Sequence, residues 1–132
     1  MTAAWVKDEI ASFGRLLELS SFALDDRGLA AVRFENGVTL RLELSDTDLW
    51  VQTLFALPAD DGAVGRLLAE AQPERNRVRR GAESPCVRAA YLDRSGEALL
   101  AAKLPRDRIE AAAIDTVFRD LFERAVRLGR AS

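Results

Sequence analysis

Histidine is absent from this chain of 132 residues, and cysteine and methionine occur once each. Without histidine, the chain lacks the commonest general base at neutral pH, the usual zinc ligand and the usual partner of a nucleophilic serine. Its single cysteine, Cys86, cannot form a disulfide within the chain, so folding does not depend on an oxidising compartment. Because Cys86 stands at the start of a predicted strand with no imidazole to activate it, we predict a buried structural thiol.

Long hydrophobic runs are also missing. No apolar segment approaches the roughly 20 residues that span a bilayer. The first ten residues, MTAAWVKDEI, contain acidic side chains by position 8 and no continuous apolar stretch, unlike a signal peptide. The length is typical of a single domain, here 1–132. We therefore expect one cytoplasmic domain without membrane insertion.

Motifs for cofactor chemistry are not found either, since the sequence contains no Walker A segment and no GxGxxG. Acidic residues occur in pairs at 25–26, 46/48 and 60–61, each at a predicted turn or helix start. Short polar side chains at such places cap backbone groups, and we prefer this interpretation to metal ligation or to a glycosidase pair. The sequence therefore predicts no catalytic residue, no metal and no cofactor.

The net charge is −2, and it is unevenly distributed. Residues 1–61 carry five basic and eleven acidic side chains, whereas 62–132 carry fourteen and ten. The one local basic cluster is the segment 73–84, which has four arginines but no aromatic residue on which a nucleic acid base could stack. We interpret this segment as a solvated or dimer-edge loop and expect no nucleic acid partner.

What the sequence does contain is apolar residues at regular spacing. Residues 3–19, with Thr2 as a candidate cap, follow the period of a helix. One stripe on this helix consists of Val6, Ile10, Phe13 and Leu17. A second stripe, rotated by about 100°, consists of Trp5, Leu16 and Leu19. Because one stripe suffices to dock a helix, the second indicates a surface for another partner.

From residue 29 the period changes to two. Segments 29–34 and 38–44 flank Asn36–Gly37, a hairpin signal for which we expect positive φ at both positions. A third strand, 49–57, is apolar on both faces and ends before Pro58. The side chains on one face of this strand can pack on helices. Those on the other face, which include Trp50 and Leu54, are either covered by a terminal helix or form a groove for a partner.

The second half predicts a helix over 62–72, strands over 86–93 and 97–104, and a final helix over 107–128. Asp107 is the expected cap of that final helix and Gly129 its expected end. Its predicted buried face consists of Ile109, Ala113, Val117, Leu121, Ala125 and Leu128. Hairpins predominate, so the order α-β-β-β-α-β-β-α predicts an α+β fold with an antiparallel sheet.

The stretch 37–128 resembles the class I chaperones of bacterial type III secretion. The resemblance depends on LxxLP before the second helix, on LLAEAQ at its end, and on DRSGEALL followed by LP before the final helix. It implies a non-catalytic chaperone that binds the N-terminal segment of a secreted effector in extended form and keeps it export-competent. The candidate effector contacts are Trp5, Phe13, Leu16, Leu19, Trp50 and Leu54.

The resemblance also implies a homodimer formed mainly through the second helix, although some relatives pair with a different chaperone. The narrow apolar seam of that helix fits this role, and it consists of Val64, Leu67, Leu68 and Ala71. Two alternatives stay open on the residues alone. One is a small α+β regulatory or adaptor domain that binds a folded protein, and the other is a histidine-free hydrolase that uses paired carboxylates.

Overall fold

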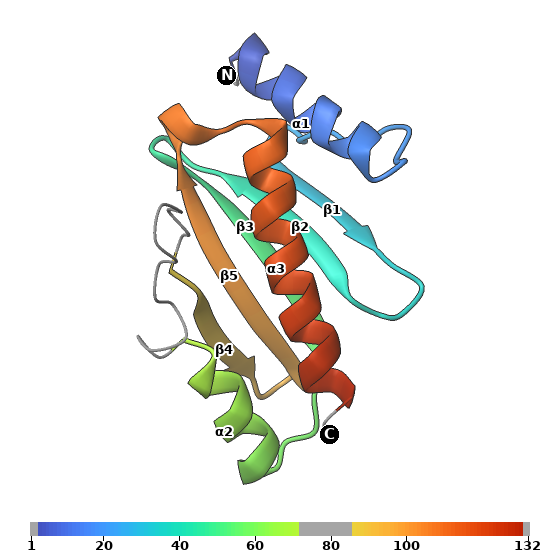
Figure 1. Ribbon diagram of the computed structural model, residues 1–132, viewed down its shortest axis with the longest axis vertical. Coiled ribbons are helices and arrows are strands. Elements are labelled where there is room, and N and C mark those ends of the chain that lie inside the picture. The colour runs from blue at the N-terminus through green and yellow to red at the C-terminus, as the bar shows by residue number, and fades with distance from the viewer. Residues whose placement is uncertain (1–2, 72–85, 131–132) are drawn as a thin grey trace.

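The computed structural model describes residues 3–71 and 86–130 (Figure 1). Its elements follow the expected order, with one 3₁₀ turn added before the last helix. They are α1 (Ala4–Leu16), β1 (Leu29–Arg33), β2 (Thr39–Leu44), β3 (Asp48–Ala56), α2 (Asp61–Ala69), β4 (Arg88–Leu92), β5 (Glu97–Pro105), η2 (Arg106–Arg108) and α3 (Ala111–Arg130). Among the described residues, no helix is both long and apolar enough to cross a membrane.

The five strands form one sheet in the order β1-β2-β3-β5-β4, and every neighbouring pair is antiparallel. The predicted α+β class with an antiparallel sheet is therefore confirmed. The longest strands, β3 and β5, pair with each other at the centre, while β1 and β4 form the two edges. Strand β5 enters the sheet beside β3 after the chain has passed through α2.

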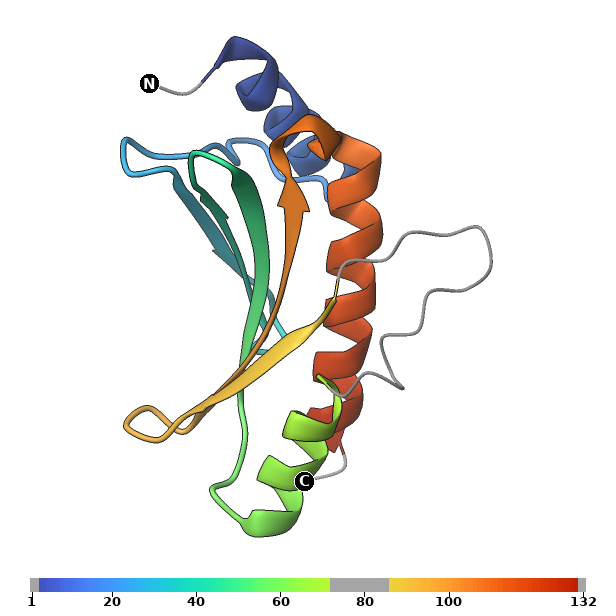
Figure 2. The same cartoon turned by 90° about the vertical axis from the view of Figure 1, so that its left-hand side faces the viewer.

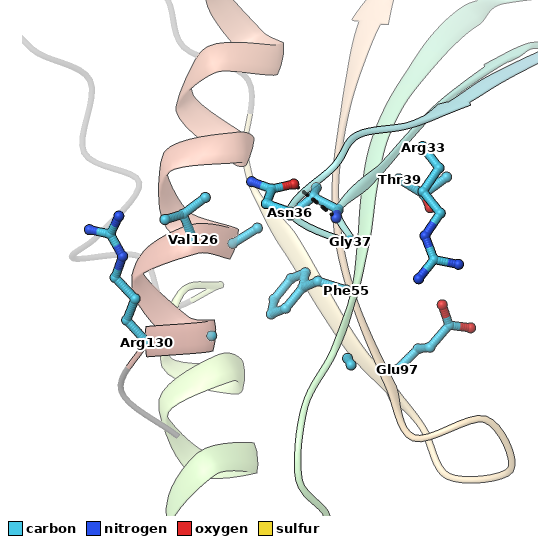
Figure 3. Close-up of a pocket in the computed structure, with 12 residues that line it drawn as sticks. Arg33, Asn36, Gly37, Thr39, Phe55, Glu97, Val126 and Arg130 are labelled. Atoms are coloured by element: carbon cyan, nitrogen blue, oxygen red, sulfur yellow. Dashed lines mark hydrogen bonds between the residues drawn. The ribbon is translucent and has the colours of Figure 1, made fainter.

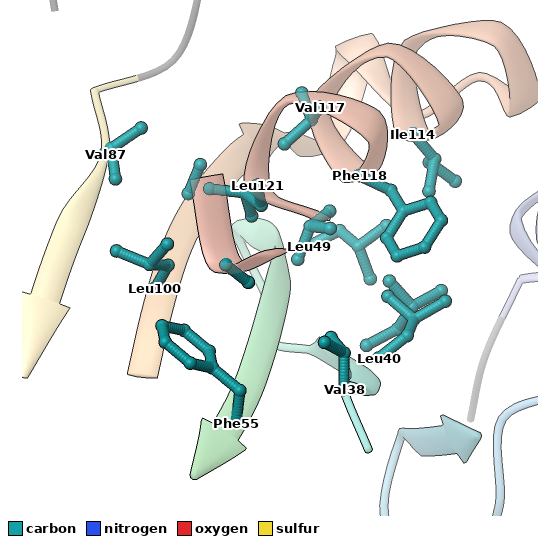
Figure 4. Packing of buried hydrophobic residues seen from close by; sticks show 14 of the residues in the cluster. Val38, Leu40, Leu49, Phe55, Val87, Leu100, Ile114, Val117, Phe118 and Leu121 are labelled. Carbon is teal, nitrogen blue, oxygen red and sulfur yellow. The ribbon is translucent and has the colours of Figure 1, made fainter. Parts of the chain in front are cut away.

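One face of the sheet packs against α3, which crosses it obliquely (Figures 1 and 2). Alternate residues of the strands point to this face, so they meet the apolar stripe of α3 in one core. Figure 4 shows how close these side chains lie, with Leu40, Leu49 and Leu100 of the sheet beneath Ile114, Phe118 and Leu121 of α3. The sequence predicted Val117, Leu121, Ala125 and Leu128 on this stripe but missed Ile114 and Phe118.

The end of α1 differs from the prediction. The helix stops at Leu16, and the backbone N–H of Leu19 donates to the carbonyl of Gly14 at 2.8 Å, while that of Glu18 donates to Arg15 at 3.0 Å. Glu18 has a φ of 60°, so this is a Schellman motif with a left-handed residue that is not glycine. Leu19 therefore follows the helix and does not continue its second stripe. At the other end, the expected cap Thr2 lies outside the described residues.

The start of α3 also corrects the prediction, because Asp107 lies in η2 and the helix begins at Ala111. The backbone N–H of Ala111 donates to the Glu9 carboxylate of α1 at 2.9 Å. A carboxylate at a helix N-terminus satisfies an unpaired donor and opposes the helix dipole. The cap of α3 thus comes from a residue 102 positions away in the sequence. At the C-terminal end, the helix continues through Gly129 to Arg130, so Gly129 is not its stop.

We expect Glu9→Ala to lower the free energy of unfolding by about 0.5–2 kcal/mol, the usual cost of losing a helix cap. Urea denaturation at neutral pH measures this difference. Asp8→Ala is the matched control, since Asp8 is the exposed neighbour of Glu9 on α1. Equal stability of the two variants would show that the Glu9 carboxylate does not hold α3.

The hairpin between β1 and β2 forms where Asn36–Gly37 predicts it, but with a different turn. The N–H of Gly37 donates to the carbonyl of Phe34 at 3.0 Å, and the N–H of Phe34 donates to the carbonyl of Val38 at 2.9 Å. Gly37 has a φ of 88°, whereas Asn36 does not have a positive φ. The connection is therefore a type I turn closed by a bulge at Gly37, and only the glycine needs the left-handed conformation.

Candidate functional site

The face of the sheet that points away from α3 is a candidate binding surface, and we call it the open face. Figure 2 shows α3 on one side of the sheet and no described element packed on the other. Because directly paired residues point to the same side, the register assigns side chains to this face. Its apolar members on β3, β5 and β4 are Trp50, Leu54, Ala56, Leu99, Ala101, Ala90 and Leu92.

Trp50 is the largest side chain of the open face, and it is only partly buried. The guanidinium carbon of Arg88 lies 5.3 Å from the centre of its ring, and the ammonium nitrogen of Lys103 lies 5.9 Å from it. Both distances are within the range of a cation–π interaction. The two cations hold the indole in place and leave part of its surface for another molecule.

Further along β3, Leu54 pairs with Leu99 of β5 and is also partly buried. Between Trp50 and Leu54 lies Gln52, whose side-chain oxygen accepts a hydrogen bond from Nε of Arg41. The open face therefore alternates apolar side chains with fixed polar ones along β3. Such a surface can take the apolar residues of an extended chain while its polar groups bind the intervening backbone.

Of the residues predicted to bind an effector, Trp50 and Leu54 share the open face, whereas the others lie on or after α1. Trp5 is 47% exposed and Leu16 is 53% exposed, as the second stripe requires. Leu19, which follows the helix, is half-buried. Phe13 corrects the prediction: it is fully buried, with its ring 6.0 Å from those of Phe22 and Phe118. It belongs to the core and is not accessible to a partner.

The predicted seam of α2 is divided between the core and the surface. Leu67 is fully buried in this chain, whereas Leu68 is 49% exposed. Val64 and Ala71 are half-buried. The side chain of Leu67 points into the core of its own subunit, so it cannot at the same time contact a second subunit. Leu68 and Val64 are the members of the seam that a second subunit can reach.

Two residues of the acidic pairs, Asp25 and Asp60, accept hydrogen bonds from backbone N–H groups. The N–H groups of Leu29 and Arg27 donate to Oδ1 of Asp25 at 3.0 and 2.8 Å, and these bonds hold the pKa of that carboxyl below its ordinary value. Asp60 caps α2 by accepting from the N–H of Ala63 at 2.7 Å. The capping interpretation is confirmed for both. Cys86, in contrast, is exposed and precedes β4, so the prediction of a buried thiol is wrong.

The sequence did not single out Arg88, Lys103 or Leu99, although all three lie beside Trp50 or Leu54. Alternation within β5 placed Leu99 and Lys103 on one face, but it could not show which face that was. Only the pairing of β5 with β3, rather than with a strand adjacent in sequence, decides this. The loop 73–84 lies outside the described residues.

No protein-family model matches the chain, and no curated protein matches it. Several solved structures do match. SycH, a type III secretion chaperone of Yersinia pestis solved with a stable fragment of YscM2, is 18% identical and has a TM-score of 0.68 over 93% of this chain and 98% of that one. The match to the ExsC–ExsE complex has a TM-score of 0.71 at 19% identity, over 92% of this chain and 89% of that one.

The ExoT–SpcS complex of Pseudomonas aeruginosa also matches, with a TM-score of 0.64 at 19% identity, over 96% of this chain and 98% of that one. Each match extends over most of both chains, so the similarity concerns the fold as a whole and not one part of it. The resemblance noted in the sequence is thus confirmed at the level of architecture. This chain has the fold that the type III secretion chaperones share.

Proposed function

We propose that this protein is a non-catalytic type III secretion chaperone that binds the N-terminal segment of a secreted effector in extended form. The segment would cross the open face and continue onto the exposed surface of α1, with Trp50, Leu54, Trp5 and Leu16 as contacts. While bound, it would stay unfolded, soluble and ready for export. The cytoplasm is the compartment in which such a chaperone meets its newly made cargo.

The observation that carries this proposal is the uncovered sheet face, which has Trp50 on its central strand, β3. A contiguous apolar patch on an uncovered sheet commonly marks an interaction site, and Trp50 shares this face with Leu54 and Leu99. The two edge strands, β1 and β4, add unpaired backbone groups that an extended chain can bind. Two of the matching solved structures are of the type III secretion chaperone SycH with a fragment of YscM2 and of a chaperone–effector complex of SchA with HopA1, which supports the same use of this fold.

The charge of the open face supports a preference for an acidic cargo segment. Four basic side chains point to this face, namely Arg33, Arg41, Arg88 and Lys103, against the three carboxylates Glu43, Asp48 and Glu97. This local excess of positive charge contrasts with the net charge of −2 of the whole chain. Carboxylates on a bound segment would therefore speed association and fix its register, and salt would weaken binding.

The direct test uses the N-terminal segments of proteins encoded beside this gene, each produced together with the chain. We expect one such segment to co-purify in a stable complex and to resist trypsin when bound, while showing no protection alone. Circular dichroism of the free segment should show no stable fold. A cargo that binds only as a folded domain, or a complete lack of binding among the neighbouring secreted proteins, would overturn the proposal.

The chaperone would act as a dimer through the accessible part of α2, which includes Leu68 and Val64. An exposed leucine on a short helix beside an edge strand is the kind of surface that a second copy covers. Figure 1 shows that α2 lies beside β4 at the periphery of the sheet, away from α1. A second subunit could therefore pack on α2 and leave the surface of α1 available to cargo.

The neighbouring residues Leu67 and Leu68 of α2 allow the proposed dimer contact to be tested separately from folding. Leu68→Glu should yield a folded monomer in light scattering, because it places a charge in the subunit contact. Leu67→Glu should instead unfold the chain, since burial of an unpaired carboxylate costs several kcal/mol. A dimer that survives Leu68→Glu would place the subunit contact elsewhere.

A further inference from the structure

A cavity of about 470 Å³ lies at one end of the sheet, apart from Trp50 (Figure 3). It is bounded by the β1–β2 hairpin, by the end of β3 with the start of β5, and by the last turn of α3. Its floor is apolar, because Phe55, Val38 and Ala125 line it and each of them is almost fully buried. This volume lies within the range of sites that bind small ligands or single large side chains.

Small residues create the cavity. Gly37, Ala56, Ala125 and Gly129 all line it, so three separate elements contribute little or no side chain there. A Cβ atom added at Gly37 or at Gly129 would meet nothing within 4 Å. The space is therefore open beside both the hairpin and the helix, and a larger side chain at position 129 would start from a Cβ that meets no neighbour.

The backbone of β3 presents hydrogen-bonding groups to this space. Strand β2 pairs with β3 only as far as Leu54, whereas β5 continues to pair as far as Ala56. The N–H of Leu57 donates to Gly96 on the β5 side at 3.0 Å. Because successive residues of a strand turn their N–H and C=O to opposite sides, those of Ala56 point away from β5. On that side β2 has not yet begun, since its first residue, Thr39, pairs with Leu54. Ala56 is therefore a free site for a strand-like hydrogen bond.

The cavity is also lined by polar side chains, which are Arg33, Glu97, Asn36, Thr39 and Arg130. Figure 3 shows the guanidinium of Arg33 and the carboxylate of Glu97 pointing toward each other from β1 and β5. Among the described residues no ion pair joins these two side chains, so each can bind a further group. A peptide unit has both a C=O that can accept from the guanidinium and an N–H that can donate to the carboxylate. A single charged side chain has only donors or only acceptors and could not bind both groups.

We propose that this cavity receives one large apolar side chain of an extended polypeptide whose backbone bonds to Ala56, Arg33 and Glu97. The polypeptide is the cargo segment, so this part of the inference rests on the proposed function. Ala56 lies six residues beyond Trp50 on the same strand, or about 20 Å at the rise of an extended strand. A segment that follows β3 would thus be anchored at Trp50 and again in the cavity.

The test uses N-acetyl-phenylalanine N-methylamide, a single apolar residue with a peptide unit on each side. In a ¹⁵N–¹H NMR titration, the amides of Gly37 and Ala56 should shift and saturate at millimolar concentration. Gly129→Leu should weaken this binding at least about tenfold by filling the space, whereas Gly129→Ala, which adds only one methyl group, should leave it within about twofold. The serine analogue should produce no saturable shift, because the floor is apolar.

Each contrary result identifies what failed. Shifts confined to other residues, or equal binding to wild type and Gly129→Leu, would overturn the site. Shifts of Gly37 and Ala56 that follow the protein concentration without the probe would overturn it in favour of a second copy of this chain. Cargo that binds wild type and Gly129→Leu equally would overturn the cavity as a cargo anchor while leaving the chaperone function intact. Probe binding without any cargo binding would support the site and contradict the chaperone function.

Discussion

Phe13→Ala is expected to destabilise the protein by about 3–5 kcal/mol, the usual cost of removing a buried aromatic ring. Phe13 is fully buried, and it forms edge-to-face contacts with Phe22 after α1 and with Phe118 of α3. No neighbouring chain segment can fill the resulting space, because Phe118 is itself held between Phe34 and Phe122. For a domain whose total stability is about 5–15 kcal/mol, this loss brings the chain close to unfolding. Urea denaturation followed by circular dichroism measures it.

Trp5→Ala is the matched control, since it removes a larger ring from the same helix. Trp5 is 47% exposed, so its removal should change the free energy of unfolding by no more than about 1 kcal/mol. The comparison distinguishes the two stripes of α1 directly. If Phe13→Ala were as stable as wild type but bound cargo poorly, α1 would not be docked as the structure has it.

Trp50→Ala should weaken cargo binding by a factor of about 30 or more while leaving the fold intact. Aromatic residues at the centre of an interface commonly contribute 2 kcal/mol or more on truncation, and about 1.4 kcal/mol corresponds to a factor of ten. Trp50 meets the conditions for such a contribution, because Arg88 and Lys103 hold its ring and part of the ring is free. Isothermal titration calorimetry with the co-purifying cargo segment measures the change.

Thr116→Ala, on the exposed outer side of α3, is the control for cargo binding. It should not change the affinity, since α3 covers the face of the sheet opposite to Trp50. Lys103→Glu should weaken binding mainly at low salt, because it reverses a charge beside the ring. A Trp50→Ala variant that binds cargo as tightly as wild type would remove the open face from the proposed function.

Features that depend on neighbours in the sequence could be predicted well. Alternating segments, together with the apolar run before Pro58, predicted the five described strands, and the capping roles of Asp25 and Asp60 followed from their positions at a turn and a helix start. Gly37 was correctly placed at a hairpin, although the turn has positive φ at that residue alone. In each case the physical cause is local, because side chain and backbone a few residues apart form the bond or the turn.

Features that depend on contacts between distant segments could not be predicted. Two stripes on α1 look equally apolar, yet only packing against α3 decides that Phe13 is buried and Trp5 is not. The same holds for Leu67 and Leu68 on α2. Glu9 caps α3 at Ala111, which is 102 positions away in the sequence, and no local sequence pattern predicts this contact.

The sequence by itself determined the elements, their order and the absence of histidine chemistry, since periodicity and composition are properties of neighbouring residues and of the chain as a whole. Tertiary structure alone decided which apolar residues are free to bind. The insertion of β5 beside β3 places Lys103 and Leu99 next to Trp50 and Leu54. Because β2 begins only at Thr39, opposite Leu54, Ala56 has no partner strand on the side away from β5, where the cavity lies. Burial depends on how the whole molecule packs. The candidate binding surface could therefore be identified only from the structure, in which α3 covers the other face of the sheet.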